Sequence, residues 1–518
     1  MTSTSKSDIL IVGAGPTGMI LAIELARRGI NFRMIEKRKE PTTMSRAFTL
    51  HAKTMEMLEH MGIAHHFLNV GIKSRGFYFS FQGKDAHPTL DFTKLDTDYP
   101  YVLVYDQSET DKHLREHLDM TYDVRPEWST ELIELKQDGE RCRAVLRRAD
   151  SSEEEIIEPT WVVGCDGVNS FVRTAADLDF TGSKYEGMIM QMMDTSAEGF
   201  EGSDDWVHYY ISREKFLLVT KMPSGYHRLG VSGMGEAEDP NQTRRELFQN
   251  LIDQHVEGTT LAEPVLERKW EVRRRIASDY RNGNIFLAGD AAHVHSPSGG
   301  QGMNVGMQDA FNLGWKLALV ASGKAQRKLL DTYSLERMPI GKQVLAGTDA
   351  MHDIIMAHGR GMEDRMQLTQ TDGWHNNTVS LISGLSYNYR DAISLAPELK
   401  LDNGILPGNR APNVSLQGET RLLDILRHPR MTLLIAAQKD ADNRAMEEIA
   451  AVVSARFGES IQVSVTEESE EFASRYGTYD QPHIYLIRPD GYVFCHCLLT
   501  DASLLLDYLS DWLCPASS

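Results

Sequence analysis

The chain has 518 residues, of which 41% are hydrophobic and 25% charged, the ordinary composition of a soluble globular protein with two to four structural domains. Its formal net charge of −20 argues against nucleic acid and anionic membranes as partners. No stretch approaches the length of a membrane span, and none of the five cysteines belongs to a Cys-x-x-Cys pair, so we expect a reduced, cytoplasmic protein.

The first elements of the chain predict a binding unit for a dinucleotide. Residues 8–12 form a short apolar run typical of a buried parallel strand, and a helical pattern follows that Gly29 is expected to end. Between them lie the glycines of a GxGxxG motif. The first permits a tight turn, the second lets the backbone approach a pyrophosphate, and the third allows close packing of helix on strand. These glycines are Gly13, Gly15 and Gly18.

The second strand of this unit ends in an acidic residue. Residues 32–35 are predicted to form the strand, and Glu36 follows 18 residues after Gly18, where a carboxylate binds ribose hydroxyls. An acid at this position disfavours a 2′-phosphate. The N-terminus of the preceding helix would face the phosphates with free N–H groups. This order of elements favours a nucleotide site over an ordinary glycine turn.

The middle of the chain changes character. Residues 161–173 form another apolar strand that runs into a turn at Asp166-Gly167 and the start of a helix. The alternating stretches 206–211 and 215–221 then predict antiparallel strands. We expect residues 181–280 to form a sheet that roofs a pocket.

A second glycine motif follows this region, at Gly289-Asp290-Ala291-Ala292-His293. A flavoprotein needs this pattern to bind the opposite side of the same cofactor that the first motif binds. The two motifs together indicate that one FAD lies across both halves of a large domain. The residues after the second motif become long and helical.

The end of the chain reads as a separate small unit. The loop at residues 405–412 has the composition of a domain boundary, and strand and helix patterns follow it. Cys495-His496-Cys497 sits in an apolar, strand-like run. We interpret these three residues as packed strand residues rather than a metal or redox site, and we predict no metal site.

Three motifs in this order, at residues 13–18, 166–167 and 289–290, resemble the group A flavin-dependent aromatic hydroxylases, the class of para-hydroxybenzoate hydroxylase and phenol hydroxylase. The resemblance covers roughly residues 8–395. The tail is similar to the thioredoxin-like extension of the phenol hydroxylase branch, without a Cys-x-x-Cys. Within that branch, three stretches look closest to the pentachlorophenol 4-monooxygenase subfamily, namely residues 45–52, 202–221 and 351–356.

The predicted fold class is therefore α/β, with a Rossmann-like FAD-binding domain, an antiparallel-sheet substrate domain and a C-terminal thioredoxin-like domain. The FAD-binding domain is expected in two parts, residues 1–180 and 281–400. The substrate sheet is expected at 181–280 and the C-terminal domain at 405–518.

The resemblance also implies which residues hold the cofactor. Beyond the first glycines and Glu36, the expected contacts to the ribose, the pyrophosphate and the ribityl chain are Arg46, Gln107, Asp166, Arg173, Gly289 and Asp290. The residues expected beside the flavin ring are Pro297, Gly302, Met303 and Asn304, where a helix start would supply N–H donors. A surface salt bridge at Arg46 and a helix cap at Asp166 are the alternatives. His293 and His295 are better explained as structural histidines.

By the same resemblance, NAD(P)H reduces FAD, O2 forms a C4a-hydroperoxyflavin, and its terminal hydroxyl is transferred to an electron-rich ring. A phenol that reacts as phenolate is the expected substrate, with halogen or nitro substituents among the candidates. The site must then exclude water and must stabilise the phenolate or accept its proton. NADPH rather than NADH is a family expectation, and we expect a homodimer.

Candidate substrate residues lie in the central sheet. Tyr210 and Lys215 are the leading catalytic pair, together with Pro297 beside the flavin, and His208, Tyr210 and Tyr226 are the leading substrate contacts. Only about half of the side chains on a strand can face the pocket, so packing on the outer face is the alternative for each. Further candidates are Tyr209, Arg213, Lys221 and the methionines Met188, Met190, Met192 and Met193.

Four other functions are alternatives to a phenol hydroxylase. A monooxygenase for a larger polycyclic natural product stays open. A flavin-dependent halogenase would carry a Trp-x-Trp segment, which the chain lacks, and nothing around Lys73 marks it as a catalytic lysine. The intact Gly289-Asp290 motif argues against a purely structural flavin, and the missing Cys-x-x-Cys opposes a disulfide reductase.

Overall fold

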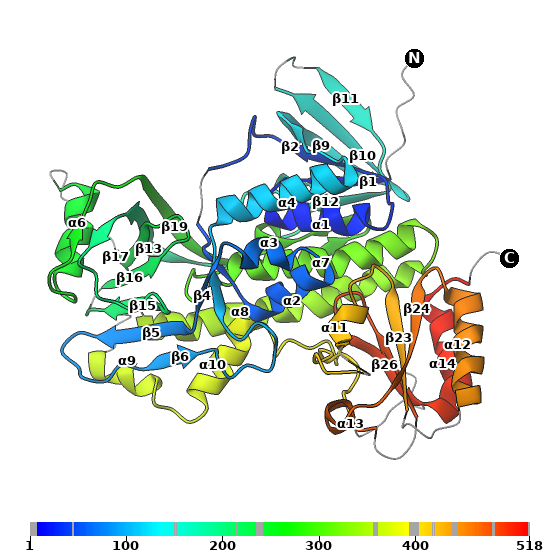
Figure 1. Cartoon of the computed structure of the whole chain (residues 1–518). Helices are drawn as coiled ribbons and strands as arrows, with labels where there is room; N and C mark the ends of the chain where they lie inside the picture. Colours follow the sequence, from blue (N-terminus) through cyan, green and yellow to red (C-terminus); the bar gives the residue numbers. More distant parts are fainter. Residues whose placement is uncertain are drawn as a thin grey trace.

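The structure is a computed structural model of the whole chain, and the part that it describes falls into three regions (Figure 1). A parallel sheet with its helices lies in the middle, a large mixed sheet lies on one side, and the C-terminal α/β unit lies on the other. The described residues are 8–43, 46–149, 151, 153–213, 215–234, 242–355, 361–392, 404–416, 418, 420–437, 443–478 and 482–515.

The central sheet is built from short apolar runs that are distant in the sequence. Its strands are β1 (Ile9–Val12), β2 (Phe32–Glu36), β8 (Glu127–Trp128), β12 (Trp161–Gly164), β20 (Arg281–Asn282) and β21 (Ile285–Leu287). Their order is β20-β21-β12-β1-β2-β8, and all neighbours run parallel except β20 and β21. Every residue of β1 and β12 is buried, as expected for strands covered on both faces. The predicted Rossmann-like unit is confirmed.

Two helices, α1 (Pro16–Ala26) and α7 (Gly302–Ala321), pack against each other at unusually short range. A Cβ atom added at Gly306 would lie 2.8 Å from Thr17 Oγ1, and one at Gly314 would lie 2.5 Å from Glu24 Cβ. A side chain at either position would therefore force the two helices apart. The glycines of α7 hold the backbones of these helices together.

The large sheet joins the predicted antiparallel strands to strands from outside the expected range. Its members are β5 (Gly76–Phe81), β6 (Thr89–Asp91), β13 (Phe180–Thr195), β15 (Trp206–Ile211), β16 (Lys215–Lys221), β17 (His227–Met234), β19 (Leu266–Ala277) and β22 (His293–Val294). The order is β22-β19-β13-β17-β16-β15-β5-β6, and only β15 and β5 run parallel. The sheet thus uses chain from both sides of residues 181–280.

Smaller elements complete the regions around the two sheets. The strands are β3 (Thr49–Leu50), β4 (Ile72–Ser74), β7 (Val102–Val104), β9 (Thr130–Asp138), β10 (Arg141–Arg148), β11 (Glu154–Ile157), β14 (Ala197–Glu198) and β18 (Thr260–Leu261). The helices are α2 (Ala52–His60), α3 (Ala64–Leu68), α4 (Gln107–Tyr122), α5 (Phe171–Ala175), α6 (Arg244–Ile252), α8 (Thr332–Ile355), α9 (Met362–Leu368) and α10 (Trp374–Ser383). In the described part of the chain, no helix is both long and apolar enough to cross a membrane.

The C-terminal unit is a four-stranded sheet between two layers of helices. Its elements are α11 (Leu422–Ile425), β23 (Met431–Ala437), α12 (Asn443–Phe457), β24 (Ile461–Glu467), α13 (Glu470–Tyr476), β25 (His483–Ile487), β26 (Val493–Leu498) and α14 (Ala502–Trp512). The order β24-β23-β25-β26, with β23 and β24 parallel and the other pairs antiparallel, is thioredoxin-like. Cys495 and Cys497 are buried in β26, as expected for packed strand residues.

A turn of this C-terminal unit is buried against the FAD-binding part. Arg488, just after β25, donates hydrogen bonds to both carboxylate oxygens of Glu336 on α8, each at 2.7 Å, and also bonds Asp490. Lys316 on α7 donates to the same Glu336 at 2.7 Å. Burial raises the pKa of Glu336, but Arg488 and Lys316 outweigh it and bring the pKa to about 2. This carboxylate is therefore ionised at neutral pH, in a network that joins the two parts.

Replacing Arg488 with Met should lower the free energy of unfolding by about 3–5 kcal/mol, because Glu336 and Asp490 would lose a fully buried partner. Equilibrium denaturation by guanidinium chloride measures the loss. The matched control is Arg444→Met, which breaks an exposed pair with Glu448 at 3.0 Å and should cost less than about 1 kcal/mol. Equal losses in the two variants would show that the network adds no stability.

Candidate active site

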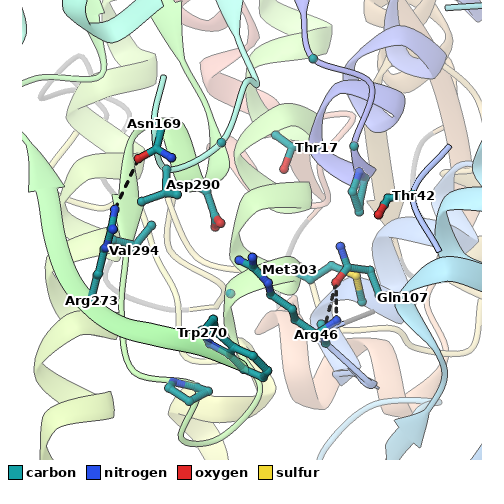
Figure 2. Close-up of a pocket in the computed structure, with 18 of the residues that line it drawn as sticks. Thr17, Thr42, Arg46, Gln107, Asn169, Trp270, Arg273, Asp290, Val294 and Met303 are labelled. Carbon is teal, nitrogen blue, oxygen red and sulfur yellow. Dashed lines mark hydrogen bonds between the residues drawn. The ribbon is translucent and has the colours of Figure 1, made fainter. Parts of the chain in front are cut away.

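A cavity of about 720 Å³ lies where the central sheet meets the large sheet. Its walls come from the loop between β1 and α1, the end of β2, the loop after β12, strands β13, β16 and β19, and the segment between β22 and α7. Figure 2 shows Arg46 and Trp270 on one side of this cavity and Asn169 and Arg273, which share a hydrogen bond of 3.4 Å, on another. The two glycine motifs therefore open into one space.

The first glycine motif forms one end of the cavity. Gly13 has a φ of +106°, and a Cβ atom there would lie 2.3 Å from the carbonyl oxygen of Cys165, so only glycine fits. Gly15 differs: a Cβ atom added there meets nothing within 4 Å and would project into the cavity. Since the first N–H groups of α1 have no partner within the helix, this open space suits a pyrophosphate.

Glu36 lies at this end of the cavity in the position expected for ribose binding. Its Oε2 accepts a hydrogen bond from the backbone N–H of Ala14 at 3.0 Å, and Arg38 binds the same carboxylate. Burial raises the pKa of Glu36, but the hydrogen bonds from Arg38 and Ala14 more than offset this and leave the pKa lowered. The carboxylate is ionised and is well suited to accept hydrogen bonds from ribose hydroxyls.

Arg173 connects the second and third motifs. Its guanidinium donates to the carbonyl oxygen of Ala291 at 2.8 Å and to that of Val168 at 3.0 Å. Asp166, on the same loop, accepts from the backbone N–H groups of Phe171 and Val172 at 2.8 and 3.2 Å. Asp166 therefore lines the cavity and also caps the start of α5, and its contact with FAD stays a prediction.

Arg46, Gln107 and Asp290 reach the cavity from three separate segments. The side-chain oxygen of Gln107 accepts hydrogen bonds from the backbone N–H groups of Arg46 and Ala47 at 3.1 and 3.2 Å. The guanidinium of Arg46 lies 5.7 Å from the ring centre of Trp270 (Figure 2). Burial raises the pKa of Asp290, and the electrostatic interactions with His293 and Arg46 offset part of this rise. Gln107 thus fixes the backbone that carries the cationic side chain of Arg46 into the cavity.

The segment that leads into α7 is held from behind by side chains of the β3 region. Asn304 donates to the carbonyl oxygens of Thr49 and Gly300, both at 2.9 Å, and its side-chain oxygen accepts from the backbone N–H of His51. Burial lowers the pKa of His51 to about 4, so its neutral ring binds the Gly299 carbonyl at 2.9 Å. Pro297, Gly302 and Met303 line the cavity as expected. Asn304 positions the loop instead of lining the cavity.

The far end of the cavity is an apolar chamber. Its lining residues are Phe48, Met190, Met192, Tyr209, Phe216, Leu218, Trp270, Val272, Pro297 and Ser298. Burial raises the pKa of Tyr209, and hydrogen bonding from the backbone of Gly299 offsets only part of this rise. The phenol of Tyr209 is therefore neutral. Aromatic rings and adaptable methionines make this chamber suitable for a flat apolar ring.

The catalytic pair predicted from the sequence lies on the opposite face of the sheet. Tyr210 packs in a core with Leu217, Val219 and residues of α6, and the ring of His208 stacks on it at 5.9 Å. Lys215 alternates with Phe216 on β16 and so points to the same outer face as Leu217. The pair Tyr210 and Lys215 is therefore replaced by Tyr209, Phe216 and Leu218, their neighbours on the inner face.

Three other candidates also lie away from the chamber. Tyr226 is 37% exposed near the turn between β16 and β17. Lys221 pairs with Asp204 at 2.6 Å on the surface, and Arg213 sits in the turn between β15 and β16.

His293 binds Asp309 at 2.7 Å in a buried network with Arg337, as a structural histidine would.

Trp270, Val272 and Phe48 were missed. A signal exists for the first two: on β19, apolar residues at 270, 272 and 276 alternate with charged ones, as on a strand with one buried face. Phe48 lies in an extended segment before β3 and reaches the chamber only through the fold.

Comparisons with known proteins agree with this geometry. Residues 6–348 match the family described as FAD binding domain, and residues 405–516 match the family described as aromatic-ring hydroxylase, C-terminal. The chain is 43% identical to pentachlorophenol 4-monooxygenase of Sphingobium chlorophenolicum, over 98% of this chain and 97% of that protein. It is 32% identical to 6-methylpretetramide 4-monooxygenase of Streptomyces rimosus, over 94% and 90% of the two chains.

Among solved structures, the anhydrotetracycline hydroxylase OxyS from Streptomyces rimosus superposes with a TM-score of 0.79 at 27% identity, over 98% of this chain and 99% of that one. The likeness extends through the parallel sheet, the large sheet and the C-terminal unit, because it covers almost all of both chains.

Replacing Gly15 with Val should leave the fold intact and weaken FAD binding by at least about tenfold, or 1.4 kcal/mol. The new side chain meets no protein atom but fills the space beside the α1 N-terminus. The ratio of flavin to protein absorbance, followed by titration with FAD, measures the loss.

The control for this variant is Gly361→Val. Gly361 also has a negative φ, −64°, and a Cβ atom there would make only an ordinary contact, at 3.5 Å from Asp364 Oδ2. Gly361 does not line the cavity. It should bind FAD like the parent protein. Normal FAD affinity in Gly15→Val would mean that the pyrophosphate lies elsewhere.

Proposed function

Because the chain belongs to the family of FAD-dependent aromatic-ring monooxygenases, we propose that it hydroxylates a substituted phenol, with NAD(P)H as reductant and O2 as the source of oxygen. The observation that carries this proposal is the single cavity, which runs from the glycine loop and Glu36 to the apolar chamber. Bound FAD supplies the redox chemistry that activates O2.

The residues of this chain hold and orient the cofactor. Gly15 leaves room for the pyrophosphate, Gly13 permits the turn that carries it, and the carboxylates of Glu36 and Asp290 suit ribose and ribityl hydroxyls. At the other end, the N-terminus of α7 begins at Gly302, where N–H groups and the positive end of the helix dipole favour an anionic flavin ring. Arg46 adds a cation on the same side.

The chamber selects the substrate by shape and by excluding water. Phe216, Leu218, Trp270 and the two inner methionines offer apolar surface on the sheet side, so a ring that fills the chamber displaces water from the reacting centre. The polar groups that a phenolic hydroxyl can meet in the chamber include the side chains of Ser298 and Tyr209. These features support a halogenated or nitrated phenol, as does the similarity to pentachlorophenol 4-monooxygenase.

A polycyclic aromatic substrate is the second candidate. It is supported by the similarity to 6-methylpretetramide 4-monooxygenase and by the fold shared with the anhydrotetracycline hydroxylase OxyS along nearly the whole chain. In that case the ring system would have to extend beyond the chamber toward Arg46.

The proposed function is tested by NADPH and NADH oxidation with purified holoenzyme across phenols, halophenols, nitrophenols and polycyclic phenols. Product, H2O2 and released halide or nitrite are measured in the same samples. We expect one class of monocyclic phenols to stimulate oxidation, with product equal to the NAD(P)H consumed. Stimulation only by polycyclic phenols would favour the second candidate, and no stimulation by any phenol would contradict both.

Tyr209 and Tyr210 lie on opposite faces of the sheet, so we expect different effects when each is replaced. Tyr209→Phe should raise the KM for the phenol and the fraction of H2O2 formed by about tenfold or less, since it removes one hydroxyl from the chamber. The matched control Tyr210→Phe should leave both unchanged, because this side chain packs under α6. Steady-state kinetics with coupled product analysis compares them. The reverse pattern would restore the outer face as the substrate site.

A cytoplasmic location and a homodimer stay predictions. Light scattering coupled to gel filtration measures the oligomeric state directly.

A further inference from the structure

A chain of three buried side chains leaves the substrate end of the cavity. Ser298, which lines the chamber, lies with its Oγ 3.0 Å from Oγ of Ser296. Ser296 Oγ lies in turn 3.3 Å from Nδ1 of His352, in the last turn of α8. All three residues are buried, with 6%, 1% and 2% of their surfaces exposed. The chain therefore links the chamber to a titratable ring that does not line it.

The local backbone holds this chain in place. The N–H of Ser298 donates to Oγ of Ser296 at 3.3 Å, so the two hydroxyls are fixed on either side of Pro297. His352 is carried by α8 beside Met351 and Ile354, which pack in the same apolar core as Met190 and Phe216 of the chamber. An apolar shell around three polar groups keeps their hydrogen bonds to one another strong.

We propose that Ser298, Ser296 and His352 form a proton relay that ionises a phenol bound in the chamber, which rests on the proposed function. The phenolic O–H gives its proton to Oγ of Ser298, whose own proton passes to Oγ of Ser296, and the Ser296 proton passes to Nδ1 of His352. The phenol becomes a phenolate and the imidazole becomes an imidazolium, while both serines end neutral. One proton moves in total, and no electron is transferred.

Hydroxyl groups suit this task because each both donates and accepts a hydrogen bond. Histidine suits the end of the chain because its ordinary pKa lies close to neutral pH. A phenolate is the electron-rich form of the ring, so its formation in a dry chamber is what the oxygen transfer requires. The relay gives the proton of an enclosed phenol, whose ordinary pKa is near 10, an acceptor that the apolar lining does not provide.

Other titratable or charged groups lie around the relay and affect its pH dependence. His295 binds the carbonyl oxygen of Ser296 through Nδ1 at 2.9 Å, and burial lowers its pKa to about 4, so it stays neutral. On α8, Asp349 lies one turn before His352 and pairs with Arg274 of β19 at 2.7 Å, and Asp353 is the next residue. From α9, Arg365 binds the carbonyls of Ile354 and Ile355.

The test uses holoenzyme with 4-nitrophenol, whose anion absorbs visible light. At about pH 6, below the pKa of the free ligand, bound 4-nitrophenol should show the anion band in the parent protein. His352→Gln and Ser298→Ala should lose the band while still binding the ligand, as seen by the change in flavin absorbance. Ser298→Thr, which keeps the hydroxyl, should retain it. The two loss variants cut the relay at opposite ends, so either one suffices if the other does not fold.

Turnover gives a second readout that a structural role would not produce. With a phenol of pKa about 10, His352→Gln should lower kcat by about 10²-fold at neutral pH, and the loss should shrink as the pH rises toward that pKa. With pentachlorophenol, already ionised at neutral pH, the same variant should lose little. The matched control is His255→Gln, which breaks another Ser–His hydrogen bond, a partly buried one to Ser212 at 2.8 Å on the outer side of the sheet.

The outcomes separate the relay from the proposed function. An anion band that persists unchanged in both His352→Gln and Ser298→Ala overturns the relay and leaves the serines as loop supports. Equal losses of kcat for both phenols at all pH values overturn it as well. If the parent protein binds no phenol of any class, this result contradicts the proposed function and therefore also the relay.

Discussion

The close approach of α1 and α7 is the constraint on which the rest of the structure depends. Glycines at 306 and 314 let the two helices touch where any side chain would separate them, and Gly306 also faces the backbone of Gly289. Each helix begins at the edge of the same cavity, one at the glycine loop and the other beside Pro297. Two positive helix ends thus face one space, an arrangement that suits a dinucleotide with two anionic regions.

The C-terminal unit contributes to this arrangement from the opposite end of α7. Its buried turn places Arg488 against Glu336, and the carbonyls of Pro489 and Asp490 bind His60 and Lys53 of α2. Helix α2 follows His51, which binds the carbonyl oxygen of Gly299, and α7 begins at Gly302, so both helices start beside the segment 297–302. The C-terminal unit therefore supports two walls of the site through buried polar and charged contacts.

Sequence reasoning succeeded where contacts are local and failed where they are distant. The strand, glycine loop and helix around Gly13 lie within one short segment, so spacing alone defined them. Tyr209 and Tyr210 are equally buried and adjacent, and only the packing of α6 against one face of the sheet decides which of them meets the cavity. The polar chain from Ser298 to His352 joins residues on different elements, and no periodicity encodes such a contact.

The interleaving of the chain also sets the order in which the protein can be assembled. The central sheet needs β21, residues Ile285–Leu287, beside β12, and the large sheet is edged by β6 and β22, residues Thr89–Asp91 and His293–Val294. Neither sheet can close before most of the chain has been synthesised, and the buried turn at Arg488 arrives later still. Contacts between such distant segments form slowly, so the nascent protein must carry unpaired strand edges for a long time. The cavity takes its walls from both sheets and from residues as far along the chain as Met303, so a nascent chain can hold flavin only after these segments have come together.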